Sequence, residues 1–275
     1  MRGLARLLVV ALALAGAAGC ATVNGDPRDP LEGFNRSMYA FNEAFDDAIG
    51  KPVATAYKSV LPDPLRDGVR NFFANIADLF IGLNSLLQGK PGDMVNDWAR
   101  FGFNTTIGVF GIFDIASEMG LEKHNEDFGQ TFGRWGAETG AYIVWPFFGP
   151  SNVRDTFGGL LDLYVDPVRR HKPEDPRTFM VLLRATSQRA DLLDASRILE
   201  EAALDKYVFQ RDAYLQRRRG LVHDGNPPRE APPSSRRPEG PGADRLLEEP
   251  ALRAAAYEPK VPANYDAVLA ASQVR

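Results

Sequence analysis

Hydrophobic residues recur at steps of three and four positions along much of the chain, which is the spacing of one face of an α-helix. The clearest run extends from Leu65 to Leu87 and predicts one long amphipathic helix, or two helices joined near Gly82. Asp63 and Pro64 precede this run, and we interpret them as an N-cap and a proline at the first helical position. Strand-like alternation is scarce, so the pattern predicts an all-α fold.

Two more regions show the helical spacing. After a glycine-rich turn at residues 89–92, apolar positions over residues 94–103 predict a helix that ends near residue 108. The same spacing runs over residues 179–219, where Asp175 and Pro176 repeat the arrangement of cap and proline. A continuous helix there would be about 60 Å long at 1.5 Å per residue, so we expect a break.

Residues 101–149 combine many aromatic side chains with many glycines. One interpretation is a set of short, broken helices and re-entrant turns at a membrane interface, where Trp and Tyr lie at headgroup level and glycine allows close backbone approach. The other is an aromatic-rich core with loops, and composition leaves both open. No stretch after Cys20 has eighteen consecutive apolar residues, so we expect no conventional transmembrane helix.

The N-terminus has the layout of a bacterial lipoprotein signal peptide. A basic start with Arg2 and Arg6 is followed by an apolar stretch and then by small residues that end directly before Cys20, the single cysteine of the chain. We therefore predict a signal peptide over residues 1–19 and acylation of Cys20. The alternative is an ordinary cleavage site beside an incidental cysteine. Ala21, where Asp would signal inner-membrane retention, favours the outer membrane.

The C-terminal part differs in composition from the rest. Nine of the 20 prolines lie between Pro227 and Pro262, among many charged residues. Such a segment buries too little apolar surface to offset its ordering entropy, so we expect residues 226–275 to be a disordered tail. A tether toward the cell wall or a partner is the alternative. Residues 20–28 are predicted to be a lipidated leash, and residues 29–225 a helical domain.

The net charge and the absence of catalytic motifs exclude several classes of function. The 275 residues carry a formal charge of −4, which argues against a nucleic-acid partner. We find no nucleophile elbow, no zinc-protease motif and no phosphate-binding loop, and the only histidines are His124, His171 and His223. His124 lies in a polar run that we interpret as a solvated loop. We therefore expect no enzyme, no cofactor and no metal site.

Several strings together carry a resemblance to a known family. The segment Asp29–Asn42, with the sequence DPLEGFNRSMYAFN, resembles the opening of the MlaA (VacJ) family of outer-membrane lipoproteins. Further strings match in family order: residues 62–71, Leu87-Gln88-Gly89, Arg100-Phe101 with Asn104-Thr105 and Gly108, residues 113–116, residues 128–133, Tyr142 with residues 146–149, Arg154-Asp155, and Tyr207 with residues 211–218. The resemblance covers nearly all of residues 29–219.

The resemblance implies a ring-shaped assembly of amphipathic and short broken helices embedded in the periplasmic leaflet of the outer membrane. It implies association with a trimeric porin and a central channel that removes mislocalised phospholipid from the outer leaflet. The phospholipid would pass to the periplasmic carrier MlaC and then to the inner-membrane MlaFEDB transporter. This transport would maintain the lipid asymmetry of the outer membrane. Palmitate and related acyl chains on Cys20 would anchor the protein.

The family pattern also nominates channel and gating candidates. Phe41 and Asn42 match a segment that helps set the closed state of the channel. The turn and glycine positions are candidates for the inner ridge and the flexible lip: Leu87, Gln88 and Gly89, then Gly108, Gly111 and Gly120. Two other functions stay open, namely a non-catalytic lipoprotein that tethers porin or cell wall, and a lipid-degrading enzyme for which no nucleophile is nominated.

Overall fold

The computed structural model describes residues 26–228, without the side chains of residues 198–202. Cys20 and most of the proline-rich tail lie outside the described residues, so the predictions made for them are untested. The first half of the described chain contains α2 (Glu32–Phe45), the π-helical turn η1 (Asp46–Gly50), α3 (Lys51–Val60), α4 (Asp63–Leu87), α5 (Pro91–Thr106), α6 (Ile115–Glu118) and α7 (Phe128–Arg134). The second half contains β1 (Tyr142–Trp145), β2 (Gly149–Asn152), α8 (Val153–Val165), α9 (Pro167–Arg170), α10 (Glu174–Asp191), α11 (Leu193–Ala202) and α12 (Lys206–Val222).

The described chain is mostly helical, but the all-α prediction is wrong in one place. Strands β1 and β2 form an antiparallel hairpin in which Tyr142 lies opposite Asn152 and Trp145 opposite Gly149. The strands have four residues each, and β2 reads Gly-Pro-Ser-Asn, which carries none of the usual strand signals. The hairpin forms because neighbouring elements satisfy its backbone, which no local pattern reveals.

The long helices follow the predicted spacing with small shifts. Residues Asp63–Leu87 form one helix without interruption at Gly82. The predicted break in the C-terminal region is confirmed, because α10, α11 and α12 are separate helices. Both predicted N-caps are displaced: Asp63 and Asp175 lie within the first turn of their helices, and neither helix has a side-chain cap.

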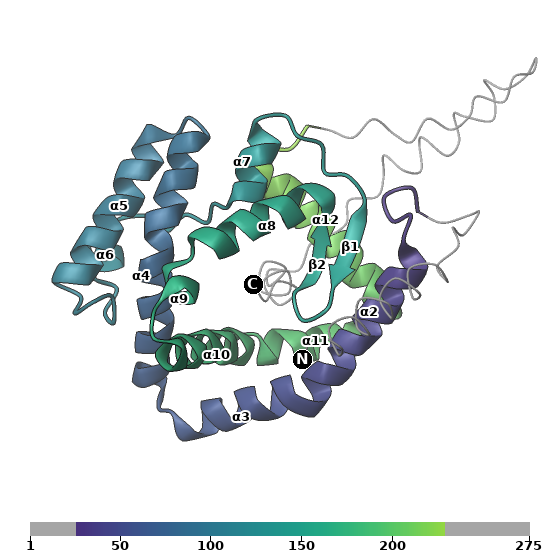
Figure 1. Cartoon of the computed structure of the whole chain (residues 1–275), viewed down its shortest axis with the longest axis horizontal. Coiled ribbons are helices and arrows are strands. Elements are labelled where there is room, and N and C mark those ends of the chain that lie inside the picture. The colour runs from purple at the N-terminus through teal and green to yellow at the C-terminus, as the bar shows by residue number, and fades with distance from the viewer. Residues whose placement is uncertain (1–25, 229–275) are drawn as a thin grey trace, which may run out of the picture.

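The elements lie around the middle of the molecule in Figure 1. Helices α2 and α3 run along the lower edge in Figure 1, α4 rises from the end of α3 at the left, and the α4–α5 pair with α6 extends outward as a lobe. Helix α10 packs on α3, α4 and α9, while α8 packs on α7 and the hairpin packs on α2 and α12. Segments far apart in sequence thus enclose the centre of the fold.

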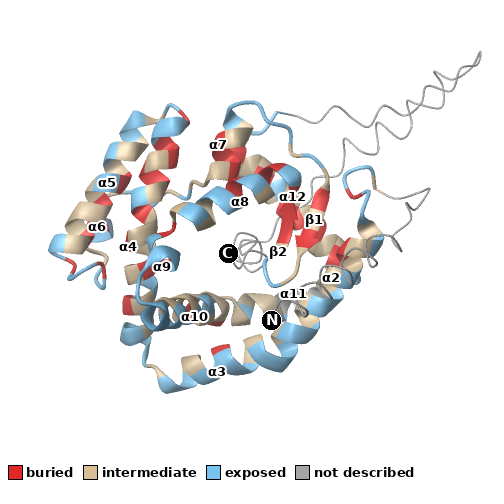
Figure 2. Ribbon diagram, in the orientation of Figure 1, coloured by how far each residue is buried: buried red, intermediate tan, exposed pale blue. Residues whose placement is uncertain are grey.

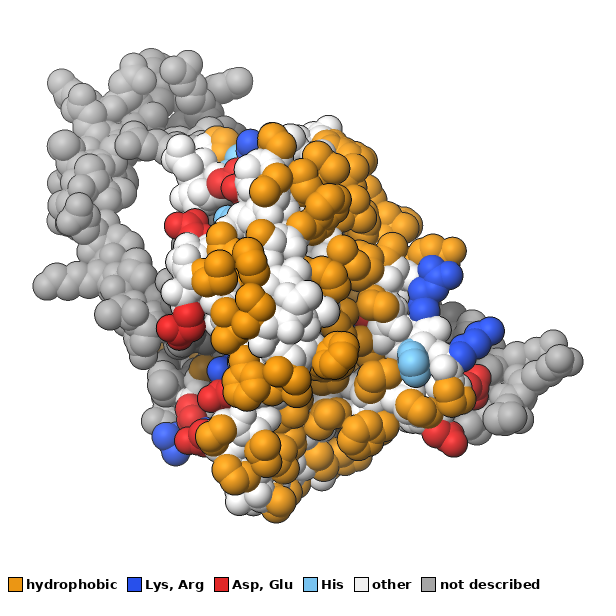
Figure 3. All heavy atoms as spheres, turned by 90° about the vertical axis from the view of Figure 1, so that its left-hand side faces the viewer, with side chains coloured by type: hydrophobic (Ala, Val, Ile, Leu, Met, Phe, Trp, Pro, Cys, Tyr) orange, Lys and Arg blue, Asp and Glu red, His pale blue; other side chains and the backbone are white. Residues whose placement is uncertain are grey.

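Burial is inverted relative to a water-soluble globular protein. Among the described residues, 20 polar or charged residues are buried against 12 hydrophobic ones. Figure 2 places the buried positions on facing sides of α4 and α5 and in the hairpin, α7 and α8. Large hydrophobic side chains are exposed instead, and Figure 3 shows them covering most of the face formed by the α4, α5 and α6 lobe, with charges near its margins. No helix within residues 26–228 is long and apolar enough to cross a membrane.

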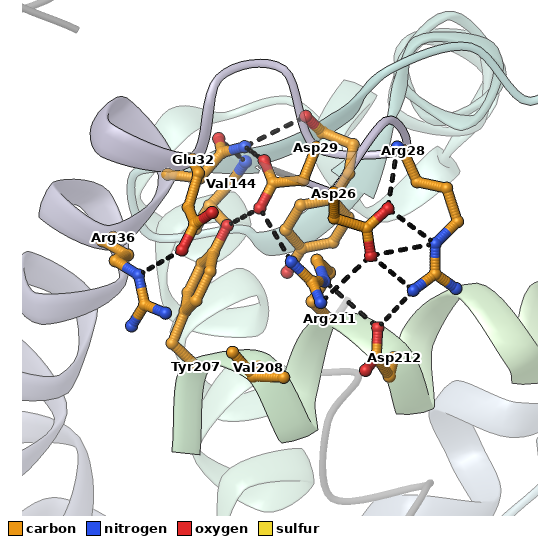
Figure 4. Close-up of polar contacts among 12 residues, drawn as sticks. Asp26, Arg28, Asp29, Glu32, Arg36, Val144, Tyr207, Val208, Arg211 and Asp212 are labelled. Atoms are coloured by element: carbon orange, nitrogen blue, oxygen red, sulfur yellow. Dashed lines mark hydrogen bonds and ion pairs between the residues drawn. The ribbon is translucent and has the colours of Figure 1, made fainter. Parts of the chain in front are cut away.

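A network of buried polar contacts joins the N-terminal segment to β1 and α12 (Figure 4). The fully buried Asn35 amide donates to Asp29 Oδ1 (2.7 Å) and accepts from the backbone nitrogen of Val144 (2.8 Å). Tyr207 donates its hydroxyl to Asp29, and Arg211 lies 3.5 Å from the same carboxylate. Burial and the nearby Asp29 carboxylate raise the pKa of Tyr207, which keeps its hydroxyl protonated as a donor.

Candidate functional site

The turn of the β1–β2 hairpin is held by α2. The Nδ2 atom of Asn42 donates to the carbonyl oxygen of Trp145 (2.9 Å), and its Oδ1 accepts from the backbone nitrogen of Phe147 (2.8 Å). Phe147 has a φ of +66°, a conformation that a bulky residue adopts only when its surroundings enforce it. One asparagine amide therefore fixes a strained turn by bonding the backbone on either side of Pro146.

Two phenylalanines of α2 add packing to this clamp. The ring of Phe147 makes edge-to-face contacts with the rings of Phe41 (5.2 Å between centroids) and Phe45 (5.0 Å). Such pairs stabilise by about 0.5–1.5 kcal/mol beyond the area they bury. All three rings are more than a third exposed, so the turn is held without being buried.

The hairpin turn lies between two cavities. The first, of about 570 Å³, is bounded by α2, η1, α3, the turn, α10, α11 and α12. The second, of about 420 Å³, is bounded by the hairpin, α8, α9 and α10. Four residues line both of them: Phe147, Phe148, Pro150 and Ala185. The cavities are therefore neighbours, separated by the turn that Asn42 holds, and each has a volume typical of small-molecule sites.

Charged side chains in the first cavity are arranged as pairs. Arg189 bonds Asp46 through Nε to Oδ1 (2.7 Å), and Lys206 bonds Glu43 (2.9 Å). These pairs join α10 to η1 and α12 to α2, so they also fix the cavity walls. Apolar side chains such as Ile49, Val53 and Leu182 make up much of the remaining lining.

A buried carboxylate forms part of the wall of the second cavity. Asp155 is fully buried and lines this cavity, and it receives hydrogen bonds from Arg218 Nε (2.7 Å) and the Tyr214 hydroxyl (2.8 Å). Burial alone would raise the pKa of Asp155, but the charges of Arg218 and Arg154 outweigh it and lower that pKa. Arg218 also bonds Asp127 Oδ1 at 2.9 Å, so the cluster ties α12 to α8 and to the start of α7.

The predicted candidates separate into two places. Asn42 lines the first cavity, and Phe41 packs on the turn beside it. Leu87, Gln88 and Gly89 lie instead at the α4–α5 turn and line neither cavity. Their contacts there are definite: the Leu87 carbonyl accepts from Trp135 Nε1 (2.9 Å), and Gln88 Nε2 donates to Glu126 (2.8 Å).

The glycine candidates lie in and after the loop that follows α5. Gly111 has a φ of +85° and packs closely on Asn75, so any side chain would be strained there. Gly108 and Gly120 belong to the same outward lobe, and none of the three lines either cavity. Around this loop Val109, Phe110, Ile112 and Phe113 are exposed to solvent. The ridge and lip roles assigned to these positions stay predictions.

The lobe is held together by a buried ion cluster. Arg100 donates through Nη2 to both oxygens of Asp114 (2.9 Å each), and Asn104 Nδ2 donates to the same carboxylate (2.9 Å). Burial raises the pKa of Asp114, but the hydrogen bonds from Ser117 and Asn104, with the charge of Arg100, outweigh it and bring the pKa to about 2. The loop after α5 is thereby bonded to α5 itself.

His124 belongs to this lobe as well. Its Nδ1 lies 2.7 Å from Oδ1 of the buried Asp97, and its Nε2 lies 3.9 Å from Asp93. Within residues 26–228, no three side chains of the His, Cys, Asp and Glu types gather as a metal ion would require. The contact with Asp97 accounts for the position of His124, because it fastens the loop that contains His124 to α5.

The turn string Pro146-Phe147-Phe148-Gly149 matches the family pattern, but the sequence alone does not place it in the site. The tertiary fold does so, because Phe147 and Phe148 line both cavities. The contributions of α10, such as Ala185 and Arg189, were also missed, since their spacing is only that of a helix face. A signal was present in the turn string, where proline and glycine flank two large aromatic residues.

Fold and site together define a class of protein: mostly helical, with a polar interior, many exposed hydrophobic side chains, and two adjoining cavities beside a clamped turn. The family model described as MlaA lipoprotein matches residues 27–220. The chain belongs to the MlaA lipoprotein family.

Individual relatives agree with this assignment. The chain is 35% identical over 228 residues to the "Intermembrane phospholipid transport system lipoprotein MlaA" of Shigella flexneri, covering 80% of this chain and 90% of the relative. It is 34% identical over 227 residues, with the same coverage, to the protein of that name from Escherichia coli (strain K12). A solved structure described as "Structural basis for maintenance of bacterial outer membrane lipid asymmetry" matches with a TM-score of 0.63 and 31% identity, covering 70% of this chain and 98% of the other.

Proposed function

We propose that this protein is the outer-membrane lipoprotein of an intermembrane phospholipid transport system, and that it removes mislocalised phospholipid from the outer leaflet to maintain lipid asymmetry. The names of its relatives describe transport lipoproteins, which supports a non-catalytic role. The observation that carries the proposal is the pair of adjoining cavities within a protein whose exposed surface is rich in apolar side chains. Acyl chains and a polar headgroup need such a combination to pass through one protein.

The helices form a ring embedded in the periplasmic leaflet, anchored by acylation of Cys20. The exposed hydrophobic side chains of α4, α5 and α8 would contact acyl chains, while the buried ion clusters keep the polar interior satisfied. The lobe of α4, α5 and α6 supports this arrangement, because Val109, Phe110, Ile112 and Phe113 protrude together from its loop. Apolar side chains grouped in this way are costly in water and stable in lipid.

The hairpin turn acts as the gate between the two cavities. With Asn42 bonded to Trp145 and Phe147, the turn separates the cavities, and release of these two hydrogen bonds would join them. Phe41 belongs to the same gate through its contact with Phe147. Leu87, Gln88 and Gly89, and the glycines at positions 108, 111 and 120, would act at a distance by fixing the lobe that faces the lipid.

The phospholipid passes from this protein to other proteins of the transport system. We expect a trimeric porin to hold this protein in the outer membrane, a periplasmic carrier of the MlaC type to accept the phospholipid, and an inner-membrane MlaFEDB transporter to supply energy. The described chain offers no nucleotide-binding loop motif, so the drive must come from such partners.

The experiment that tests the function measures phospholipid in the outer leaflet of the outer membrane. We expect deletion of this protein to raise surface phospholipid and sensitivity to detergent with chelator, and the Cys20→Ala form to fail to restore the wild-type level. Unchanged surface phospholipid after deletion would exclude transport and favour the structural tether. Release of fatty acid by the purified protein would indicate a lipid-degrading enzyme.

A further inference from the structure

The second cavity has a charged end and an apolar end. At the charged end Asp166, the first residue after α8, faces two arginines. Arg184 of α10 donates through Nη1 to Asp166 Oδ2 (2.9 Å), and Nε of Arg169 in α9 lies 3.7 Å from the same oxygen. All three residues line the cavity, so two guanidinium groups converge on one carboxylate at its wall.

Two guanidinium groups face a single carboxylate at this end. Asp166 also accepts a hydrogen bond from the backbone nitrogen of Val168 (3.0 Å) as the N-cap of α9, so it is fixed in place. The side chains of Arg169 and Arg184 both stay partly exposed, so each has guanidinium nitrogens that a ligand can reach.

The other acidic residues of the cavity are engaged elsewhere. Asp155 is neutralised by Arg154 and Arg218. Asp162 Oδ1 accepts a hydrogen bond from the backbone nitrogen of Phe128 (3.4 Å). Phe128 is the first residue of α7, where the helix dipole favours a negative charge. Each of these two carboxylates therefore has partners outside the Asp166 cluster.

Apolar side chains make up much of the remaining wall of the cavity. Leu160 and Leu163 of α8, Val181 of α10, and the aromatic pair Phe147 and Phe148 of the hairpin turn line it. Phe147 and Phe148 also face the first cavity, so an apolar chain held here would extend toward the turn. A cationic end and an apolar body in one cavity match a ligand with an anionic group joined to hydrocarbon.

We propose that Arg169 and Arg184 form the phosphate-binding subsite of this protein, which holds the phosphodiester of a phospholipid in the second cavity with its acyl chain along Phe147, Phe148 and Leu160. Guanidinium groups bind phosphate through paired, charge-assisted hydrogen bonds, which a carboxylate-paired arginine can still offer from its remaining nitrogens. The inference rests on the proposed transport function and specifies the part of the lipid that is recognised.

The test compares lipids that differ only in phosphate. Purified full-length protein in detergent is titrated with short-chain phosphatidylethanolamine and with diacylglycerol of the same chains, and binding is followed by native mass spectrometry. We expect wild-type protein to bind the phospholipid at least about tenfold more tightly, the difference that one charge-assisted hydrogen bond supplies. Equal affinity for the two lipids would overturn the proposal.

Arg169→Gln is the main variant, because Arg184 still neutralises Asp166 in it and the fold is preserved. We expect it to lose most of the preference for the phospholipid, and Arg169→Lys to restore part of it. Arg177→Gln is the matched control, since Arg177 is likewise an arginine paired with a carboxylate three residues away, Glu174 at 3.4 Å, but lines neither cavity. A preference that survives Arg169→Gln unchanged would refute the assignment.

Inorganic phosphate distinguishes a lipid site from a general anion site. We expect millimolar inorganic phosphate to compete poorly, because it lacks the hydrocarbon that fills the apolar wall. Displacement of the phospholipid by equimolar inorganic phosphate would overturn the lipid assignment. If the variants bind as wild type while deletion still raises surface phospholipid, the subsite is wrong and the transport function stands. Unchanged surface phospholipid after deletion contradicts the function itself, whatever the binding data.

Discussion

The side-chain oxygen of Asn42 accepts a hydrogen bond from the backbone nitrogen of Phe147 at 2.8 Å, across 105 residues of sequence. The same side chain donates to the carbonyl oxygen of Trp145, so the hairpin turn depends on one residue of α2. Because Phe147 has a positive φ, the turn has no strong preference of its own for this conformation.

Replacing Asn42 with alanine removes both bonds to the turn. We expect hydrogen exchange at the Phe147 amide to become at least about fivefold faster, since the loss of one hydrogen bond is worth roughly 1 kcal/mol or more. Asn96→Ala is the matched control, because Asn96 bonds a backbone carbonyl at Glu122 within the lobe. Equal exchange at Phe147 in wild type and Asn42→Ala would show that packing alone holds the turn.

The buried Asp155 cluster predicts a large effect on stability. In Asp155→Asn, Arg218 and Arg154 lose a charged partner inside the protein, which costs about 3–5 kcal/mol of unfolding free energy. Denaturant unfolding measures it. Asp194→Asn removes an exposed, solvent-screened partner of Lys58 and should change the unfolding free energy far less. Similar losses in the two variants would contradict the structural role of the cluster.

The free energy of unfolding should depend on pH through the ionisation of Asp114. Its folded pKa of about 2 lies below its ordinary value of 3.8, so its contribution is complete above about pH 4 and is lost as the pH falls through 2. We expect Asp114→Asn to be less stable than wild type at pH 7, with the difference shrinking toward pH 2. Thermal unfolding over this range measures it, and a difference that does not change with pH would argue against an ionised Asp114.

Helices α7 and α8 touch at a glycine. A Cβ atom on Gly158 would lie 2.3 Å from the backbone nitrogen of Gly129, so Gly158→Ala forces the two backbones apart. We expect a loss of about 2 kcal/mol in unfolding free energy. The control is Gly102→Ala within α5, where no atom lies near the added Cβ, and a gain of about 0.5–1 kcal/mol is expected from helix propensity. A neutral Gly158→Ala would mean that the helices can separate.

The exposed loop after α5 should determine affinity for lipid. Phe110 is 71% and Phe113 58% exposed. Changing both to asparagine removes apolar area worth about 1.5–3 kcal/mol per side chain when buried, so binding of the unacylated protein to vesicles should fall at least about tenfold. Thr106→Asn, at an exposed position just before the loop, is the control. Sedimentation with vesicles measures binding, and equal binding of the double variant would exclude this loop as a lipid contact.

The sequence by itself determined those helices whose apolar positions follow a clear local period: α4 and α5, and a broken C-terminal region, follow from spacing alone. It also indicated the family, through strings such as the one that contains Asn42. It did not determine the β-hairpin, since Gly149–Asn152 has no strand propensity and is stabilised by partners far away in sequence.

Only the tertiary structure decided which residues form the site. Phe147 and Arg189 meet at one cavity, and Arg169 and Arg184 meet at Asp166, because α8, α9, α10 and the hairpin converge there. Ion pairs and side-chain bonds across such distances leave no periodic trace in a single sequence, because they depend on how complete helices pack. A local pattern therefore predicted the elements, whereas long-range polar contacts decided their arrangement and the position of the cavities.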